Sequence, residues 1–197
     1  MKKIFAFAVA IIATMGISVA AQDSKMYVGG QLGFWHESDG ISVNDRSFST
    51  NALTILPEVG YNLDENWAVG TQIGYSLNHI CGAGISSHLF QFNPYARYSF
   101  YKSDNGKVSL FVDGGAGIGA GWTHYDGGDE SDTAVTWKIG LKPGVAFHPS
   151  EKFSIVAHLG MLGYEGANNA AKAGGYKSQG GLLFNANNMG LSFYYNF

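Results

Sequence analysis

The sequence is poor in cysteine, in charged residues and in long apolar runs. Cys81 is its one cysteine, so the chain forms no disulfide within itself. Lysine and arginine number 12 against 15 acidic residues, for a net charge of -3, and no basic cluster occurs. This composition argues against a nucleic-acid partner, which requires a basic surface. Beyond the first 21 residues, no segment reaches the ~20 apolar residues of a membrane-spanning helix.

The first residues, MKKIFAFAVAIIATMGISVAA, predict a secretory signal peptide. Lys2 and Lys3 form its basic start, residues 4–17 its apolar core and residues 18–21 its small-residue cleavage region. We expect a signal peptide over 1–21, cleaved after Ala20 or Ala21, and a single mature domain over 22–197. The alternative is an uncleaved N-terminal anchor, for which the apolar run is short.

Glycine is abundant, and between Asp113 and Trp122 it alternates with apolar side chains. This period of two is typical of a β-strand with one small-residue face and one apolar face. A phosphate-binding glycine loop would be followed by a Lys-Ser or Lys-Thr pair and a helix, and neither is present here. We interpret Gly115 to Gly121 as the inward side of a barrel, where glycine leaves room for long side chains from across the interior.

Similar alternation recurs along the mature chain and predicts an all-β fold of eight antiparallel strands. The predicted strands are Met26–Trp35, Phe48–Tyr61, Trp67–Leu77, His88–Tyr101, Lys107–Trp122, Ala134–Phe147, Phe153–Tyr164 and Gly181–Phe197. Their connections alternate in length. Short polar turns are expected over 62–66, 102–106 and 148–152, and longer loops over 36–47, 78–87, 123–133 and 165–180. This arrangement is typical of an up-and-down transmembrane β-barrel with short periplasmic turns and longer extracellular loops.

A soluble lipocalin-like barrel that carries an apolar ligand has the same period, with the apolar face turned inward. The composition of the two faces favours the membrane barrel, because the apolar rows contain no charge and the opposite rows carry glycine and polar residues. We therefore expect a polar network in the interior. Its predicted members are Glu58, Arg97, Asp113, Lys138, Lys142 and His158.

Aromatic residues gather near both ends of the predicted strands, as the two interfaces of a bilayer favour. One predicted girdle contains Tyr27, Tyr61, Trp67, Phe147 and Phe153. The other contains Trp35, Tyr75, Phe90, Trp122, Trp137 and Tyr164.

The segments PEVGYNLDENWAVG (57–70), NPYARYSF (93–100) and LSFYYNF (191–197) resemble the small eight-stranded outer-membrane barrel family that includes OmpX and the transmembrane domain of OmpA. The resemblance covers essentially the whole mature chain. It implies that the terminal aromatic strand is read by the outer-membrane assembly machinery, at the positions of Phe193, Tyr195 and Phe197. It specifies the architecture well and the activity poorly.

The inward charges allow two interpretations. Glu58 and Arg97 are expected to meet across the lumen, either in a polar plug that satisfies buried charge or in a gated path for ions or protons. We favour the plug. The acidic segment 126–132 lacks the residue spacing of a calcium loop, so we expect a solvated loop and leave calcium binding open.

Taken together, these patterns predict an integral protein of the Gram-negative outer membrane, with a structural or surface-interaction role carried by its loops. Eight strands leave no wide channel, so a general porin is not expected. The expected partners are outer-membrane lipids and lipopolysaccharide, the assembly machinery and a surface partner of the loops. No catalytic residue, cofactor or metal site is predicted. A lipid-A-modifying enzyme remains an alternative, since histidines and carboxylates occur together near the loops.

Overall fold

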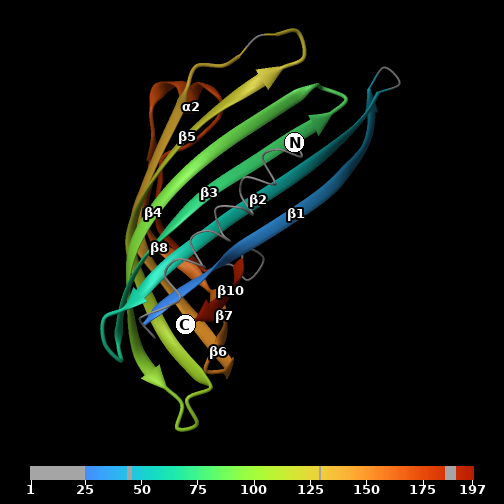
Figure 1. The fold of residues 1–197 in the computed structure, drawn as a ribbon. Coiled ribbons are helices and arrows are strands. Elements are labelled where there is room, and N and C mark those ends of the chain that lie inside the picture. The colour runs from blue at the N-terminus through green and yellow to red at the C-terminus, as the bar shows by residue number, and fades with distance from the viewer. Residues whose placement is uncertain (1–24, 44–45, 129, 185–189) are drawn as a thin grey trace.

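The computed structural model describes residues 25–43, 46–128, 130–184 and 190–197 (Figure 1). The predicted signal peptide lies outside these residues. The described chain forms one antiparallel sheet and a short helix, α2 (Asn169–Ala173). The strands are β1 Met26–Val43, β2 Arg46–Asn62, β3 Trp67–Cys81, β4 Ile85–Lys102, β5 Val108–Tyr125, β6 Ala134–Ser150, β7 Phe153–His158, β8 Gly160–Ala167, β9 Gln179–Phe184 and β10 Gly190–Asn196. None of the described helical structure is long and apolar enough to cross a membrane.

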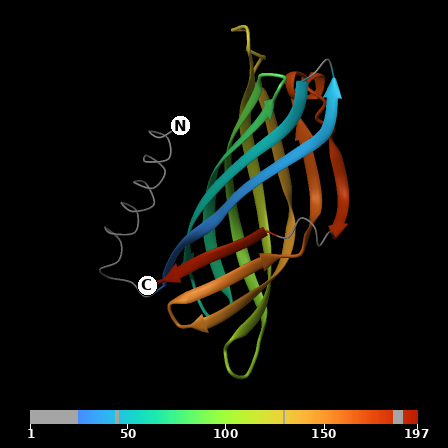
Figure 2. The same ribbon diagram turned by 90° about the vertical axis from the view of Figure 1, so that its right-hand side faces the viewer.

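The ten strand segments make up the eight predicted strands of a closed barrel. Both β7 and β8 pair with β6, one after the other, so together they form the seventh strand with a break at Leu159. Along the eighth strand, β9 pairs with β8 and β10 pairs with β7. The sheet closes where Tyr27–Gly30 of β1 pairs with Phe193–Asn196 of β10. The strands are tilted to the barrel axis (Figure 2), as closure of a sheet requires.

The two ends of the barrel differ in their connections. The β2–β3, β4–β5 and β6–β7 connections are short and lie at one end, which we call the turn end; the β3–β4, β5–β6 and β8–β9 connections lie at the other, the loop end. At the turn end, Asp64 Oδ1 accepts hydrogen bonds from the backbone N–H groups of Asn66 and Trp67, at 2.7 and 2.8 Å, and so starts β3. In the next turn Gly106 has a φ of +66°, a conformation that glycine adopts without strain.

Several strands extend further toward the loop end than the sequence predicted. The loop expected over 78–87 is a hairpin in which only Gly82–Gly84 separates β3 from β4, and much of the loop expected over 36–47 is strand in β1. The ladder between β1 and β2 continues to the pair Val43 and Arg46. Pairing satisfies the backbone groups whether or not lipid surrounds them, so the length of a ladder does not have to follow the membrane thickness.

The outward face carries the apolar rows that the sequence predicted. Exposed members of the predicted girdles are Trp67, Phe147 and Phe153 near the turn end and Trp35, Phe90, Trp137 and Tyr164 nearer the loop end. Tyr61, Tyr75 and Trp122 are partly exposed. In the last strand Phe193 points outward and is 62% exposed, while Tyr195 makes edge contacts with Phe153 and Phe197.

The girdle assignment of Tyr27 is wrong, because Tyr27 is 4% exposed and lies in the interior. Trp35 is 65% exposed, although the register of β1 puts it on the same side of the strand as Tyr27, so its place in the girdle stays a prediction. Leu32 and Phe34 occupy the outward side instead. The reason is that β1 begins with three apolar residues, Met26 to Val28, followed by two glycines, so its two faces differ little and the pattern did not identify the inward one.

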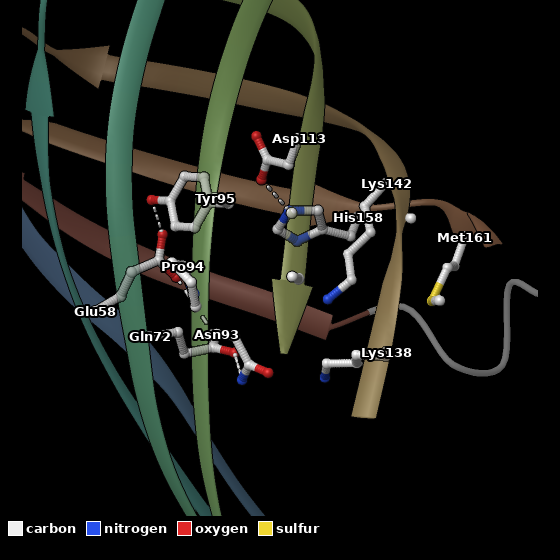
Figure 3. A pocket seen from close by; sticks show the side chains of 13 residues that line it. Glu58, Gln72, Asn93, Pro94, Tyr95, Asp113, Lys138, Lys142, His158 and Met161 are labelled. Atoms are coloured by element: carbon white, nitrogen blue, oxygen red, sulfur yellow. Dashed lines mark hydrogen bonds and ion pairs between the residues drawn. The ribbon is translucent and has the colours of Figure 1, made fainter. Parts of the chain in front are cut away.

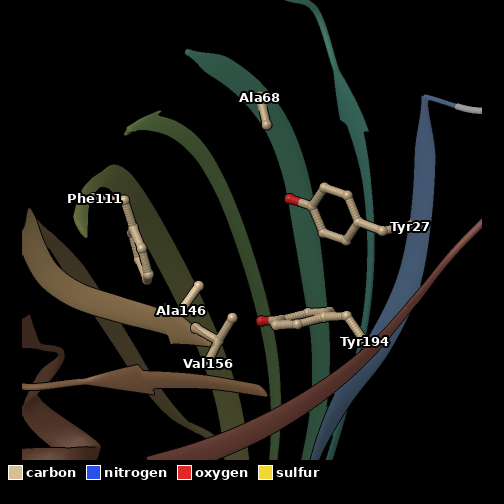
Figure 4. Close-up of a cluster of buried hydrophobic side chains, with 6 residues drawn as sticks. All are labelled: Tyr27, Ala68, Phe111, Ala146, Val156 and Tyr194. Carbon is tan, nitrogen blue, oxygen red and sulfur yellow. The ribbon is translucent and has the colours of Figure 1, made fainter. Parts of the chain in front are cut away.

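The core of buried apolar side chains sits in the turn half of the lumen. It consists of Tyr27, Ala68, Phe111, Ala146, Val156 and Tyr194, contributed by six different strands (Figure 4). Glycines on neighbouring strands make this packing possible, because a Cβ at Gly60 would collide with the ring of Tyr27 and one at Gly144 with that of Phe111. Aromatic rings therefore fill the space that these glycines leave.

Candidate functional site: the polar plug and the luminal cavity

The centre of the plug is a buried ion pair between neighbouring strands. Arg97 of β4 donates from Nε and Nη2 to the two carboxylate oxygens of Asp113 on β5, at 2.7 and 2.8 Å. The two residues face each other in the β4–β5 register, which fixes the two-point contact. From β7, which is separated from β5 by β6, His158 Nε2 lies 2.8 Å from Asp113 Oδ2. Asp113 thus joins three strands.

Glu58 is held by a second group of donors. Its Oε1 accepts hydrogen bonds from the hydroxyls of Tyr95 and Tyr194, the latter at 2.9 Å, and its Oε2 accepts one from Gln72 Nε2 at 3.4 Å. The hydroxyl of Tyr27 lies 2.6 Å from that of Tyr95. A carboxylate at 6% exposure is thereby satisfied by neutral donors.

The predicted contact between Glu58 and Arg97 is not made. The guanidinium of Arg97 pairs with Asp113 and stacks 4.1 Å from the centre of the Phe111 ring, while the rings of Tyr95 and Tyr194 lie 5.4 and 5.8 Å away. Arginine favours such aromatic neighbours once its hydrogen bonds are made. Glu58 lies on β2 and Arg97 on β4, so no register places them opposite each other.

Above the plug, toward the loop end, the lumen is hollow. A small cavity of about 50 Å³ borders the plug, with Glu58 and Tyr95 on one side, Lys138 and Lys142 on the other, and Asp113 and His158 between them, where Asp113 is the cross-strand partner of Lys142 (Figure 3). A larger cavity of about 600 Å³ continues to the loop end and is bordered there by α2 and Tyr176. Asn93 and Lys138 line both cavities.

The six residues predicted for the interior network therefore divide into two sets. Glu58, Arg97, Asp113 and His158 take part in the plug, whereas Lys138 and Lys142 line the cavity and make no side-chain hydrogen bond or ion pair within the described chain. Sequence reasoning missed the partners of Glu58. Two of these partners could have been found from the strand pattern. Tyr95 lies two residues before Arg97 and so faces inward with it, and Gln72 is opposite Glu58 in the β2–β3 register.

Glycine plays the role expected of it along β5, with one difference. A Cβ at Gly117 would meet Asn93 and Lys138, and one at Gly119 would meet Thr136. These side chains come from the neighbouring strands β4 and β6, not from across the barrel. The glycine face therefore lets adjacent inward side chains spread into the lumen.

The loop end holds several titratable groups outside the cavity. In the acidic segment, His124 Nδ1 lies 3.8 Å from Glu130 Oε1. Over the described residues, no three His, Cys, Asp or Glu side chains come together as metal ligands would. The other titratable groups of the loop end include the carboxylates of Asp126, Glu130 and Asp132 in the β5–β6 connection and the ammonium group of Lys172 on α2.

Sequence and fold comparisons agree with this architecture. The model of the outer membrane protein beta-barrel domain matches residues 5–197. The chain belongs to this family. No curated protein is similar enough in sequence to count as a match. Among solved structures, Neisserial surface protein A is 12% identical with a TM-score of 0.50, over 89% of this chain and 98% of that one.

A second similar structure is Ail, the attachment invasion locus protein of Yersinia pestis. It is 17% identical to this chain, with a TM-score of 0.45, over 88% of this chain and 97% of Ail. Another structure of Ail contains the heparin analogue sucrose octasulfate. At such identities, the likeness of this barrel to solved structures concerns the fold.

Proposed function

We propose that this outer-membrane barrel is a structural scaffold whose loops make contacts at the cell surface. The observation that carries the proposal is the plug, in which two buried carboxylates, on β2 and β5, are bonded to side chains from four other strands, β3, β4, β7 and β10. The packed turn half of the lumen thereby stabilises the barrel. The loop end is left as the part of the molecule that faces partners, with the turn end in the periplasm.

A transport role is disfavoured by the same plug. Arg97, Asp113 and the tyrosines around Glu58 occupy the turn half of the lumen, so an ion would have to displace a buried bidentate pair. On the turn side of the plug the lumen is filled by the apolar side chains of Phe111, Ala146 and Val156, which do not relay protons as carboxylates or imidazoles do. A gated ion or proton path is therefore the weaker interpretation.

An enzymatic role is disfavoured by the surroundings of the histidines. Ser109 and Ser154 both lie within hydrogen-bond distance of His148, at 3.0 and 2.8 Å, which superficially resembles an activated serine. Both serines are buried, at 6% and 5% exposure, at the turn end of the barrel. A nucleophile requires access to its substrate, and this arrangement instead links β5, β6 and β7.

The partners that we propose follow from the exposed chemistry. The outward apolar rows fit outer-membrane lipid, and Phe193, Tyr195 and Phe197 fit a recognition signal for the assembly machinery. At the loop end, an acidic connection with Asp126, Glu130 and Asp132 stands beside α2 and the following segment, which carry Lys172 and Lys177. Such a mixed surface suits lipopolysaccharide and polar surface partners.

The test compares wild-type protein with a variant in which residues 126–133 are replaced by a short glycine-serine turn. Both should be recovered from outer-membrane fractions and should migrate faster on SDS gels without boiling. We expect the variant to lose adhesion of the bacteria to each other or to host cells. Equal adhesion would contradict a role for this loop. Increased vesicle permeability, or a changed lipid A mass on expression, would replace the proposal with a transport or an enzymatic role.

A further inference from the structure

Two cationic side chains face the luminal cavity without a partner. Lys138 and Lys142 both point inward from β6, on either side of Gly140, and Figure 3 shows their amines at the same side of the cavity. Neither makes a hydrogen bond or an ion pair with any residue that the structure describes. Buried or half-buried ammonium groups ordinarily have such partners, because desolvation is costly.

The nearest carboxylates are already engaged by other donors. Glu165 is the direct cross-strand partner of Lys138, yet it accepts hydrogen bonds from Gln179 Nε2 at 3.0 Å and from the Tyr176 hydroxyl at 3.5 Å. Asp113 is neutralised by Arg97. Glu58 and Glu165 are bonded to neutral donors only, but among the described residues no carboxylate lies within ion-pair distance of either ammonium group.

The cavity also contains an acceptor that lacks a donor. Asn93 Oδ1 is buried and makes no hydrogen bond. The orientation of the Asn93 amide follows from Glu58. Gln72 donates from Nε2 to the Glu58 carboxylate, so Gln72 Oε1 is left to accept from Asn93 Nδ2, at 3.3 Å. Asn93 Oδ1 therefore points away from Gln72. A Cβ at Gly117 would contact both Asn93 Oδ1 and Lys138 Cε, so the acceptor and the lysine are neighbours.

We propose that this cavity binds a small protonated oxyanion of the phosphate class between Lys138 and Lys142, with its hydroxyl donating to Asn93 Oδ1. Phosphate carries both the negative charge that the lysines require and, at neutral pH, the proton that the amide oxygen requires. Sulfate carries the charge but no proton. The site thus favours phosphate over sulfate, because sulfate would leave the buried acceptor without a partner.

Access to the site is from the loop end. The 600 Å³ cavity shares Lys138 and Asn93 with the small cavity, whereas the plug closes the other side. The larger cavity has room for a sugar attached to the phosphate. The ligand is therefore either free phosphate or the phosphate of a small sugar ester, and in both cases it binds and leaves through the same opening. A phosphate monoester is mostly unprotonated at neutral pH, so in the ester a sugar hydroxyl in the larger cavity, which Asn93 also lines, takes the place of the phosphate hydroxyl as the donor to Asn93 Oδ1.

The experiment is isothermal titration of the folded full-length mature protein in detergent with inorganic phosphate, a sugar phosphate and sulfate. We expect binding of at least one of the two phosphates, with sulfate weaker by about tenfold or more. The sugar phosphate binds more tightly than inorganic phosphate if the larger cavity contributes. Absence of heat with both phosphates at millimolar concentrations would overturn the proposal.

Three variants locate the site. Lys138→Met with Lys142→Met should weaken phosphate binding by about tenfold or more, and Asn93→Leu should reduce the preference for phosphate over sulfate. Lys152→Met, at the exposed turn between β6 and β7, is the matched control and should bind like the wild type. If the double variant does not fold, Lys138→Gln alone should give a measurable weakening. Unchanged phosphate affinity in folded Lys138 variants would place the ligand elsewhere and refute this assignment.

Discussion

The two halves of the lumen are built from the same strands but have opposite interiors. Strand β5 shows both: near the turn end its inward positions are Phe111 and Asp113, which are fully packed, and further along they are Gly117, Gly119 and Gly121, which border a cavity. The backbone geometry and the alternation are the same throughout. The choice of inward side chain alone therefore decides whether a small barrel is filled or hollow.

This difference also separates stability from binding. In the turn half of the lumen, Glu58, Arg97 and Asp113 each have bonded partners, and removing one partner leaves the other desolvated. In the loop half, Lys138 and Lys142 border open space, where water or a ligand solvates them. Substitutions of charged residues in the turn half of the lumen should therefore lower the free energy of unfolding more than substitutions of lysines in the loop half.

The largest loss of stability is expected for Arg97→Ala. It leaves Asp113 buried without its bidentate partner and should lower the free energy of unfolding by about 3–5 kcal/mol. Urea unfolding in lipid vesicles, followed by tryptophan fluorescence, measures the loss. Lys138→Ala in the loop half should cost much less, and exposed Lys152→Ala almost nothing. Equal losses for Arg97 and Lys138 would remove the distinction between the two halves.

A double-mutant cycle tests which carboxylate pairs with Arg97. Asp113→Ala combined with Arg97→Ala should lose less stability than the sum of the single changes, because each single change strands the other charge. The combination of Glu58→Ala with Arg97→Ala should be closer to additive, since Glu58 is bonded to tyrosines and Gln72. Stronger coupling in the Glu58 cycle would contradict the observed pairing.

Glycine substitutions in the lumen should lower the free energy of unfolding less than Arg97→Ala does. Gly60→Ala puts a methyl group against the ring of Tyr27, and overpacking of this kind costs about 1–3 kcal/mol. At Gly33, further along β1, the nearest atom to an added Cβ is Thr54 Cβ at 3.7 Å, an ordinary contact. Gly33→Ala is therefore the control and should leave the urea midpoint nearly unchanged. A similar midpoint for both variants would mean that Tyr27 moves aside easily.

Tyr194→Phe should have a moderate effect. The change keeps the ring of Tyr194 in the core and removes one hydrogen bond to the Glu58 carboxylate, which is worth about 1.5 kcal/mol or somewhat more. Tyr164→Phe is matched in chemistry but lies on the outward face, where the hydroxyl makes no side-chain hydrogen bond to the described residues. Its unfolding midpoint should equal that of the wild type. A wild-type midpoint for Tyr194→Phe would show that Glu58 finds another donor.

The sequence predicted the strands better than the contacts between them. Alternation identifies the face of a residue, and it correctly turned Glu58, Arg97 and Asp113 inward. It does not report which inward residues meet, because that depends on register and on the closure of the barrel. The pairing of Arg97 with Asp113 could have been predicted from the sequence, because both residues lie eight positions from Asn105 in the β4–β5 turn.

Other contacts could not be obtained from local patterns. His158 reaches Asp113 although β6 lies between their strands, and Tyr194 reaches Glu58 from the far end of the chain. Both contacts depend on the curvature that brings non-neighbouring strands together across the lumen. The reversed side of Tyr27 has a different origin, namely the weak contrast between the faces of β1.

The smallest predicted effect concerns Asp64, at the turn end but outside the lumen. Its hydrogen bonds from the backbone N–H groups of Asn66 and Trp67 lower the pKa of this carboxyl, and Lys102 lowers the pKa further. Because the folded-state pKa is depressed, the contribution to stability is present above the unfolded-state value of about 3.9 and is lost as the pH falls through the folded-state value. Asp64→Asn should therefore unfold at slightly lower urea than the wild type at neutral pH, with the gap closing in acid. Asp104→Asn, in the next short turn, makes no such contacts and is the control; a gap independent of pH would show that the carboxylate charge plays no part in holding this turn.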